Sequence, residues 1–301
     1  MFSVVGTLKS YTDSMFDFLD KNRVRCNVSF SDLNSFRLGG NAKFVLDLHN
    51  SEVPKVLSVI ENKMPFVVIG LGCNVLVSDS GFDGVVIRLI DSNVSLQGSV
   101  VQADAGAPLQ RLLNVASHQG LSGLEWAAGL PSTVGGAVYG NAGARGFCIG
   151  DVLIGCQVLQ KGAIMYLDND KCGFEYRKSA FVDSGDIVLK AWFGLEQSTV
   201  DKVKQNLCLI KKMRNNPKGL CAGSVFKNGT DYTAGQLIDS CGLKGCRVGG
   251  AFVSEQHANF VVNDGTASSK DVYDLISTLK QKVFLKYGIQ LQLEIRLIGK
   301  F

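Results

Sequence analysis

A glycine-rich stretch at residues 129–146 constrains this chain more than any other part of the sequence. Six of its residues are glycine, and it reads GLPSTVGGAVYGNAGARG. Because glycine lacks a Cβ and adopts positive φ readily, successive backbone N–H groups can converge on one point and bind an anion, most often phosphate. The apolar residues Val134, Ala137 and Val138 favour a segment packed against the protein over the alternative, a flexible surface loop.

Residues 66–77 (FVVIGLGCNVLV) form a second glycine-containing segment, in which two apolar runs flank a short turn with Gly70 and Gly72. A Rossmann dinucleotide site needs a third glycine and a helix directly after such a turn. Here the apolar run at residues 75–77 predicts a strand instead. Any dinucleotide bound by these segments is therefore expected to bind in a non-Rossmann way.

The overall composition is that of an ordinary globular protein with room for two domains. The 301 residues are 46% hydrophobic and 19% charged, and no uninterrupted apolar run reaches transmembrane length. A net charge of +4 is too small to indicate nucleic-acid binding, and three histidines give little support for a metal site. The N-terminus lacks a signal-peptide pattern and the nine cysteines form no paired framework, so we expect reduced thiols and a cytoplasmic location.

The apolar periodicity predicts helices and strands without a strict βαβ rhythm, which is typical of an α+β fold. Helices are expected at residues 11–19, 51–62, 108–118, 197–213, 233–240 and 268–286. Strands are expected at residues 44–48, 66–69, 75–77, 85–89, 100–103, 152–160, 163–167, 187–195, 259–262 and 289–298. Lys161 and Gly162 predict a hairpin turn, and the most linker-like segment is 215–219.

Four further strings follow in order: FEYRKS at residues 174–179, AGSVFKN at 222–228, SEQHANFVVN at 254–263 and LQLEIR at 291–296. Together with the two glycine-containing segments, they resemble the UDP-N-acetylenolpyruvoylglucosamine reductase family, in its shorter, type II-like subclass. The resemblance implies an α+β chain with a vanillyl-alcohol-oxidase (PCMH-type) FAD-binding region and a smaller α+β substrate domain. The expected divisions are a helical lead-in over 1–33, the FAD-binding domain over 34–199 and the substrate domain over 200–301.

The resemblance also implies an activity. FAD is expected to bind non-covalently and NADPH to be the co-substrate that reduces it. The reduction of UDP-N-acetylglucosamine enolpyruvate would then give UDP-N-acetylmuramate for peptidoglycan. No membrane, nucleic acid or obligatory protein partner is expected. The alternatives are another FAD-dependent oxidoreductase of the superfamily, acting on an alcohol or hydroxy acid, and a non-enzymatic nucleotide-binding relative.

Three residues are implied as catalytic. Hydride addition to an enolpyruvyl group leaves negative charge beside its carboxylate, which the guanidinium of Arg177 would stabilise. Ser224 would donate the proton, and Glu294 would assist in stabilising and protonating the intermediate. From the residues alone, a surface salt bridge for Arg177, a turn for Ser224 and a solvated strand face for Glu294 stay open. The alternation of Leu291, Leu293, Ile295 and Leu297 predicts that Gln292, Glu294 and Arg296 share the opposite strand face.

The remaining site residues form three sets. The expected cofactor-binding residues lie in the two glycine-containing segments and are Gly70, Gly72, Cys73, Asn74, Thr133, Gly135, Gly136, Asn141 and Gly143. The expected substrate contacts are Lys227, Asn228, Arg296 and Arg214, the last from a basic cluster that could equally be a solvated helix end. The chain departs from the family pattern at Cys73, Ser132, Arg145 and Gly229, where serine, glycine, an aromatic residue and proline are common.

Overall fold

The computed structural model describes residues 15–301. A four-stranded sheet with the order β1-β2-β5-β3 comes first, formed by β1 (Val24–Ser29), β2 (Asn41–Leu48), β5 (Phe82–Leu89) and β3 (Phe66–Val68). The pairs β2–β5 and β3–β5 are parallel, and β1 is antiparallel to β2. Helix α2 (Val53–Ile60) buries Val53, Val56 and Ile60 in the apolar cluster on one side of this sheet. The parallel strands end near the turn of the first glycine-containing segment.

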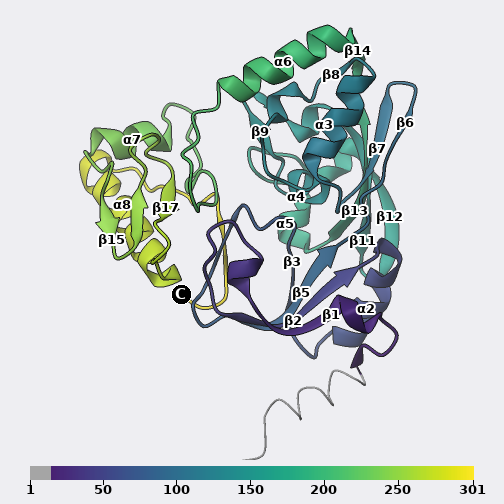
Figure 1. Cartoon of the computed structure of the whole chain (residues 1–301), viewed down its shortest axis with the longest axis horizontal. Helices are drawn as coiled ribbons and strands as arrows, with labels where there is room; N and C mark the ends of the chain where they lie inside the picture. The colour runs from purple at the N-terminus through teal and green to yellow at the C-terminus, as the bar shows by residue number, and fades with distance from the viewer. Residues whose placement is uncertain (1–14) are drawn as a thin grey trace, which may run out of the picture.

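A second sheet is antiparallel throughout, with the order β12-β11-β13-β7-β6. Its strands are β12 (Ala163–Asp168), β11 (Leu153–Gln160), β13 (Ile187–Gly194), β7 (Val100–Asp104) and β6 (Val94–Gln97). Helices α3 (Leu109–His118), α4 (Val134–Tyr139) and α6 (Val200–Lys212) lie over one region of it in Figure 1. The largest apolar cluster packs between this sheet and helices α3 and α4.

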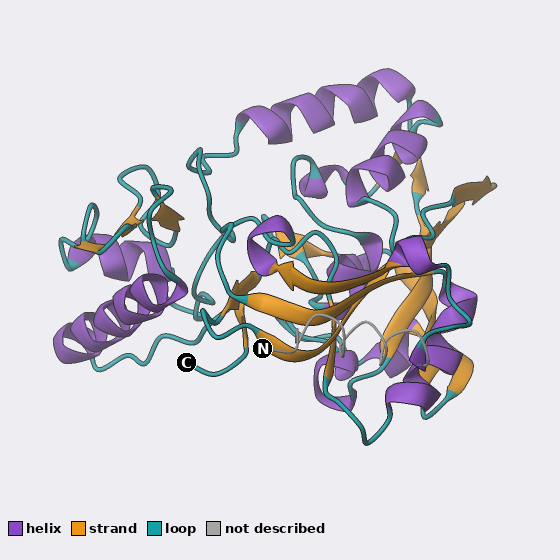
Figure 2. Ribbon diagram, turned by 60° about the horizontal axis from the view of Figure 1, so that its bottom comes forward, coloured by secondary structure: helices purple, strands orange, loops and turns teal. Residues whose placement is uncertain are grey.

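The C-terminal elements gather at the other end of the molecule (Figure 1). Helices α7 (Ala234–Ser240) and α8 (Ser269–Tyr287) pack with a small sheet of β15 (Arg247–Val248), β16 (Ala251–Val253) and β17 (Val261–Asn263). Their apolar core also contains Phe36, Leu38 and Leu76 from the N-terminal half of the chain. The chain then returns, and β18 (Arg296–Ile298) pairs in parallel with β4 (Val75–Val77). Figure 2 shows the C-terminus near the junction of the two halves.

Short elements complete the fold. They are α5 (Ala180–Ser184), β8 (Leu121–Ser122), β14 (Glu196–Gln197), β9 (Gly143–Ala144) and β10 (Phe147–Cys148), with 3-10 turns at Lys21–Arg23, Phe30–Asp32, Asn50–Glu52, Glu125–Ala127, Ile149–Asp151 and Asn169–Cys172. The predicted α+β class, the strand–turn–strand at 66–77 and the hairpin around Lys161 and Gly162 are confirmed.

Several sequence-based expectations were wrong. Residues 24–29, inside the expected helical lead-in, form strand β1, because they pair with β2. Residues 11–14 of the helix expected at 11–19 lie outside the described residues, and residues 16–19 form turns and bends rather than a helix. The glycine-rich stretch is not a loop throughout, since Thr133 caps helix α4 by accepting the Gly136 N–H at 3.1 Å. The strand expected at 289–298 is regular only at β18.

Helix α6 belongs spatially to the first half of the molecule. It contacts α3 and the 3-10 turn at Glu125–Ala127, and Leu207 and Ile210 pack against the large core cluster. The expected domain boundary near residue 200 stays a prediction. Helix α6 follows this boundary in sequence but packs with the N-terminal half of the chain.

The tight turn at Gly72 generates a stability prediction. Gly72 has φ +65°, and a Cβ there would lie 2.1 Å from the Leu33 carbonyl oxygen, whereas Gly98 has φ +60° with open space around it. Both Gly→Ala variants carry left-handed strain, but only Gly72→Ala must also displace backbone. We expect Gly72→Ala to lower the free energy of unfolding by about 1–3 kcal/mol more than Gly98→Ala in urea titrations of the apoprotein. Equal losses in the two variants would contradict this packing.

Candidate active site

The structure brings Arg177 and Glu294 into direct contact. Arg177 lies in a tight hairpin closed by mutual backbone hydrogen bonds between Glu175 and Lys178, and it has φ +56°. Its Nε donates to Glu294 Oε1 at 2.8 Å, and the two side chains are only 22% and 19% exposed. Two residues 117 positions apart in sequence therefore form a charge pair largely shielded from water.

The Glu294 carboxyl has a raised pKa. Burial is the main cause, because a charged carboxylate loses hydration there. The positive charges of Arg177 and Lys227 act in the opposite direction and do not fully offset it. Glu294 thus holds a proton more readily than an exposed glutamate, which suits a group that helps to deliver a proton.

The Ser224 segment runs beside Glu294. Phe226 bridges Leu293 in antiparallel fashion, and the Val225 carbonyl oxygen accepts the Glu294 N–H at 2.8 Å. Ser224 thus lies one residue from the carbonyl that holds Glu294. The structure assembles the backbone of all three expected catalytic residues around one junction.

The expected strand alternation holds from Leu291 to Ile295, which face one apolar core, and fails at Leu297. The N–H groups of Glu294 and Ile295 both point to the Val225 carbonyl oxygen, at 2.8 and 3.4 Å, so the chain bends. Ile295 is buried, but Leu297, expected on the same face, is 37% exposed. The bend turns Glu294 inward toward Arg177 rather than onto a solvated strand face.

A pocket of about 560 Å³ opens beside Arg177. Its walls are the loop over residues 144–151 and the hairpin that carries Arg177, with Asn228 completing them. Tyr176 also lines it, with its ring 5.1 Å from the Arg177 guanidinium and its hydroxyl accepting the Asn228 N–H at 3.4 Å. The sequence analysis did not identify Tyr176 as a site residue. The signal that could have pointed to it is its position directly before Arg177.

The two glycine-containing segments touch each other through glycine. A Cβ on Gly70 would lie 2.5 Å from Thr133 Oγ1, and one on Gly135 would lie 2.8 Å from the Ala105 Cβ. A Cβ on Gly143 would lie 3.1 Å from Arg177 Nη1, which places the second segment against the charge pair. Backbone this closely approached requires glycine, and in the second segment the N–H groups of Val134 and Gly135 already donate to the Ala107 and Ala105 carbonyl oxygens.

Other expected site residues also contact this junction. Asn74 and Asn141 form hydrogen bonds to the backbone beside the charge pair, and the Arg296 guanidinium lies 4.8 Å from the centre of the Tyr139 ring. The Lys227 N–H donates to the Gln292 carbonyl oxygen at 2.9 Å.

One of the expected substrate contacts, Arg214, lies in different surroundings. The guanidinium of Arg214 donates to the carbonyl oxygens of Ala128 and Trp126, so it fastens that turn rather than the Arg177–Glu294 pair. Burial, with the nearby charge of Arg145, lowers the pKa of Arg214. Burial raises the pKa of the Cys73 thiol, which keeps it protonated where the family commonly has serine.

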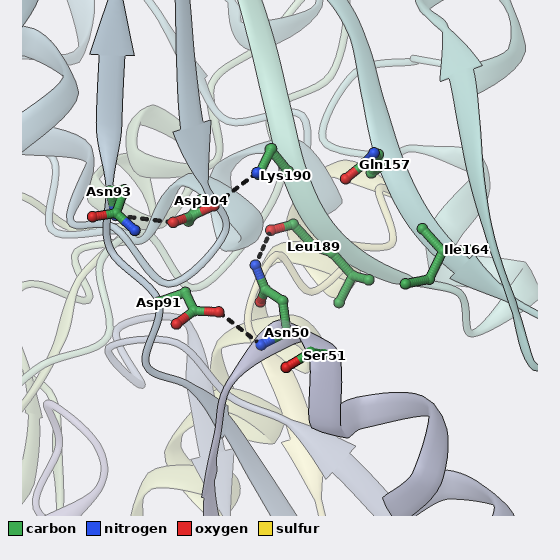
Figure 3. A pocket seen from close by; sticks show the side chains of 9 residues that line it. All are labelled: Asn50, Ser51, Asp91, Asn93, Asp104, Gln157, Ile164, Leu189 and Lys190. Atoms are coloured by element: carbon green, nitrogen blue, oxygen red, sulfur yellow. Dashed lines mark hydrogen bonds and ion pairs between the residues drawn. The ribbon is translucent and has the colours of Figure 1, made fainter.

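A second pocket, of about 350 Å³, lies where the two sheets meet (Figure 3). Its polar groups are largely bonded to one another: the Asn50 N–H donates to Asp91, the Asn50 amide to the Leu189 carbonyl oxygen, and the Asn93 N–H to Asp104. None of the expected site residues lines it. We interpret it as part of the joint between the sheets.

Two family models match this chain. Residues 44–164 match the family model of an FAD-binding domain, and residues 215–298 match that of the C-terminal domain of UDP-N-acetylenolpyruvoylglucosamine reductase. With the glycine cradle and the buried charge pair, these matches define an FAD-dependent oxidoreductase.

The relatives define the family. A UDP-N-acetylenolpyruvoylglucosamine reductase of Caldanaerobacter subterraneus is 37% identical over 96% of this chain and 98% of its own length. That of Bacillus subtilis is 38% identical over 92% and 94%. The crystal structure of the Thermus caldophilus reductase, 34% identical, matches 92% of this chain and all of its own with a TM-score of 0.81. The chain belongs to the UDP-N-acetylenolpyruvoylglucosamine reductase family.

Residues 15–301 lack two features that would indicate other kinds of site. No helix in this range is long and apolar enough to cross a membrane. Within the same range, no group of three or more His, Cys, Asp or Glu side chains is arranged to hold a metal ion.

The charge pair generates a pH prediction. Because Arg177 lowers the pKa of Glu294 while burial raises it, Arg177→Gln should raise that pKa further. Carbon-13 NMR titration of the labelled carboxyl, assigned with Glu294→Gln, would measure it, with the exposed Arg111→Gln as control. A carboxyl with a raised pKa binds its proton more tightly when folded, so its effect on stability becomes unfavourable as pH rises through the folded pKa. A pKa that falls or stays constant would contradict the assigned contact.

Proposed function

We propose that this chain reduces the enolpyruvyl double bond of UDP-N-acetylglucosamine enolpyruvate to give UDP-N-acetylmuramate, a peptidoglycan precursor. NADPH is the reductant and FAD the non-covalent cofactor. The observation that carries the proposal is the buried contact between Arg177 and Glu294 beside the Ser224 segment, in a member of this reductase family. Bound FAD would accept hydride equivalents from NADPH and pass them to the double bond.

The chain's own residues then stabilise the negative charge that forms on the substrate and supply the proton that is added to carbon. Hydride addition at the terminal carbon leaves a pair of electrons shared between the neighbouring carbon and its carboxylate, and the Arg177 guanidinium stabilises that charge. Ser224 Oγ gives its proton to the neighbouring carbon and regains a proton from solvent, and Glu294 supports that transfer. One hydride and one proton are added, and NADPH becomes NADP⁺.

The binding roles follow the same plan. The two glycine-containing segments, including Gly70, Gly72, Cys73 and Thr133, are proposed to hold FAD, within an FAD-binding domain over 34–199. Lys227, Asn228 and Arg296 are proposed to contact the substrate, in a domain over 200–301. The cytoplasm is the proposed location, and no obligatory protein partner is part of the proposal.

The first test separates the two half-reactions. Ser224→Ala should still let NADPH bleach the flavin at the wild-type rate, because no proton to carbon is needed there. Formation of UDP-N-acetylmuramate should fall by more than tenfold, equivalent to about 1.4 kcal/mol of barrier. Stopped-flow absorbance and product chromatography would measure the two steps, with the exposed Ser95→Ala as matched control. Slow bleaching in Ser224→Ala, or no product from the wild type, would refute the assignment.

The second test concerns the charge pair. Arg177→Ala and Glu294→Ala should each lower turnover by more than about tenfold. Because the two side chains act through one contact, the double variant should lose much less than the product of the single losses. Steady-state rates over a double-mutant cycle would measure this. If the activity losses of the two single variants multiply in the double variant, the two residues act independently. Full activity in either single variant would remove that residue from the mechanism.

A further inference from the structure

The side-chain amides of two asparagines in the glycine-containing segments form hydrogen bonds with protein backbone. Asn74, in the first segment, donates from Nδ2 to the Glu294 carbonyl oxygen at 3.1 Å. Asn141, in the second, donates from Nδ2 to the Glu175 carbonyl oxygen at 2.8 Å and accepts the Gly150 N–H at 3.1 Å. One amide thus reaches the backbone of Glu294, and the other reaches the hairpin that carries Arg177.

We infer that Asn74 and Asn141 are positioning residues, one from each glycine-containing segment, that set Glu294 and Arg177 against each other. The inference rests on the proposed function for the roles of Arg177 and Glu294. It goes beyond the expectation from sequence, in which both asparagines are cofactor-binding residues and no role is given to their side chains.

Glu294 lies just before strand β18, outside the regular sheet. Its N–H shares the Val225 carbonyl oxygen with the next residue, so the backbone there is bent. Asn74 holds the bend from the other side, because its amide binds the Glu294 carbonyl oxygen and its own carbonyl oxygen accepts the Arg296 N–H at 3.0 Å. A shift of Asn74 would therefore move the backbone that directs the Glu294 carboxyl.

The Arg177 hairpin is held in a comparable way. Its turn contains a non-glycine residue at positive φ, a conformation that persists only where surrounding contacts enforce it. Asn141 supplies one contact through Glu175. The buried Ser179 supplies another, since its hydroxyl donates to the Tyr139 carbonyl oxygen at 2.6 Å. Both anchors come from the end of α4 and the residues just after it, within the second segment.

The alternative, direct cofactor contact by these side chains, fits poorly for Asn141. It is only 4% exposed, and both its amide nitrogen and its amide oxygen have protein partners. Asn74 is exposed, but its amide nitrogen is already committed to Glu294.

The test uses Asn74→Asp and Asn141→Asp, which keep side-chain size and tolerance of positive φ but lose the amide donor. The matched control is Asn27→Asp, because Asn27 also has positive φ and its Oδ1 only needs to accept from Asn41. We expect the FAD dissociation constant, from quenching of flavin fluorescence, to change by less than threefold in both variants. NADPH should bleach the flavin at the wild-type rate, whereas UDP-N-acetylmuramate formation should fall by more than tenfold.

Two readouts separate positioning from general damage. Hydrogen exchange of the apoprotein, measured by mass spectrometry, should accelerate in peptides covering 291–298 for Asn74→Asp and in 174–179 for Asn141→Asp. The turnover number should also fall while the KM for the enolpyruvyl substrate changes by less than about threefold, because a displaced Arg177–Glu294 pair impairs the chemical step more than binding. Asn27→Asp should change neither.

Weaker FAD binding that parallels the activity loss, with unchanged exchange, would overturn the inference and favour cofactor contact. If Asn141→Asp does not fold, the exposed Asn74 still decides the question. If the wild type forms no muramate product, the proposed function fails, while the exchange results still judge the structural coupling.

Discussion

The parallel pairing of β18 with β4 is the constraint on which the site depends. Strand β4 is buried along its length. Strand β18 pairs with it in a register that places Arg296 opposite Val75. Glu294 stands two residues before this pairing and directly after the bridge between Phe226 and Leu293. The carboxyl is therefore delivered to Arg177 by a chain segment fastened on both sides, one fastening to each half of the molecule.

The charge pair at this junction is costly by itself. Removing two charges from water carries a desolvation cost that their attraction offsets only with good geometry. Here the cost is visible in the raised pKa of Glu294 despite the guanidinium at 2.8 Å. Its presence is better explained by chemistry than by stability, since catalytic groups need such shifted protonation and fixed orientation.

Local features of this chain were readable from sequence, whereas features made by distant contacts were not. The hairpin at Lys161 and Gly162, helix α8 and the tight turn at Gly72 follow from residue type and short-range pattern. The expectation that Arg177, Ser224 and Glu294 are catalytic came from the family resemblance, because the residue type and local sequence of each one also fit a purely structural role. The bend at Glu294 and the amides of Asn74 and Asn141 depend on partners far away in sequence, so no local pattern encodes them.

The apolar core of the C-terminal half is completed by Phe36, Leu38 and Leu76, which the N-terminal half contributes. Separating the halves would expose these three buried side chains to water, so the hydrophobic effect opposes any motion that parts the two halves at this seam.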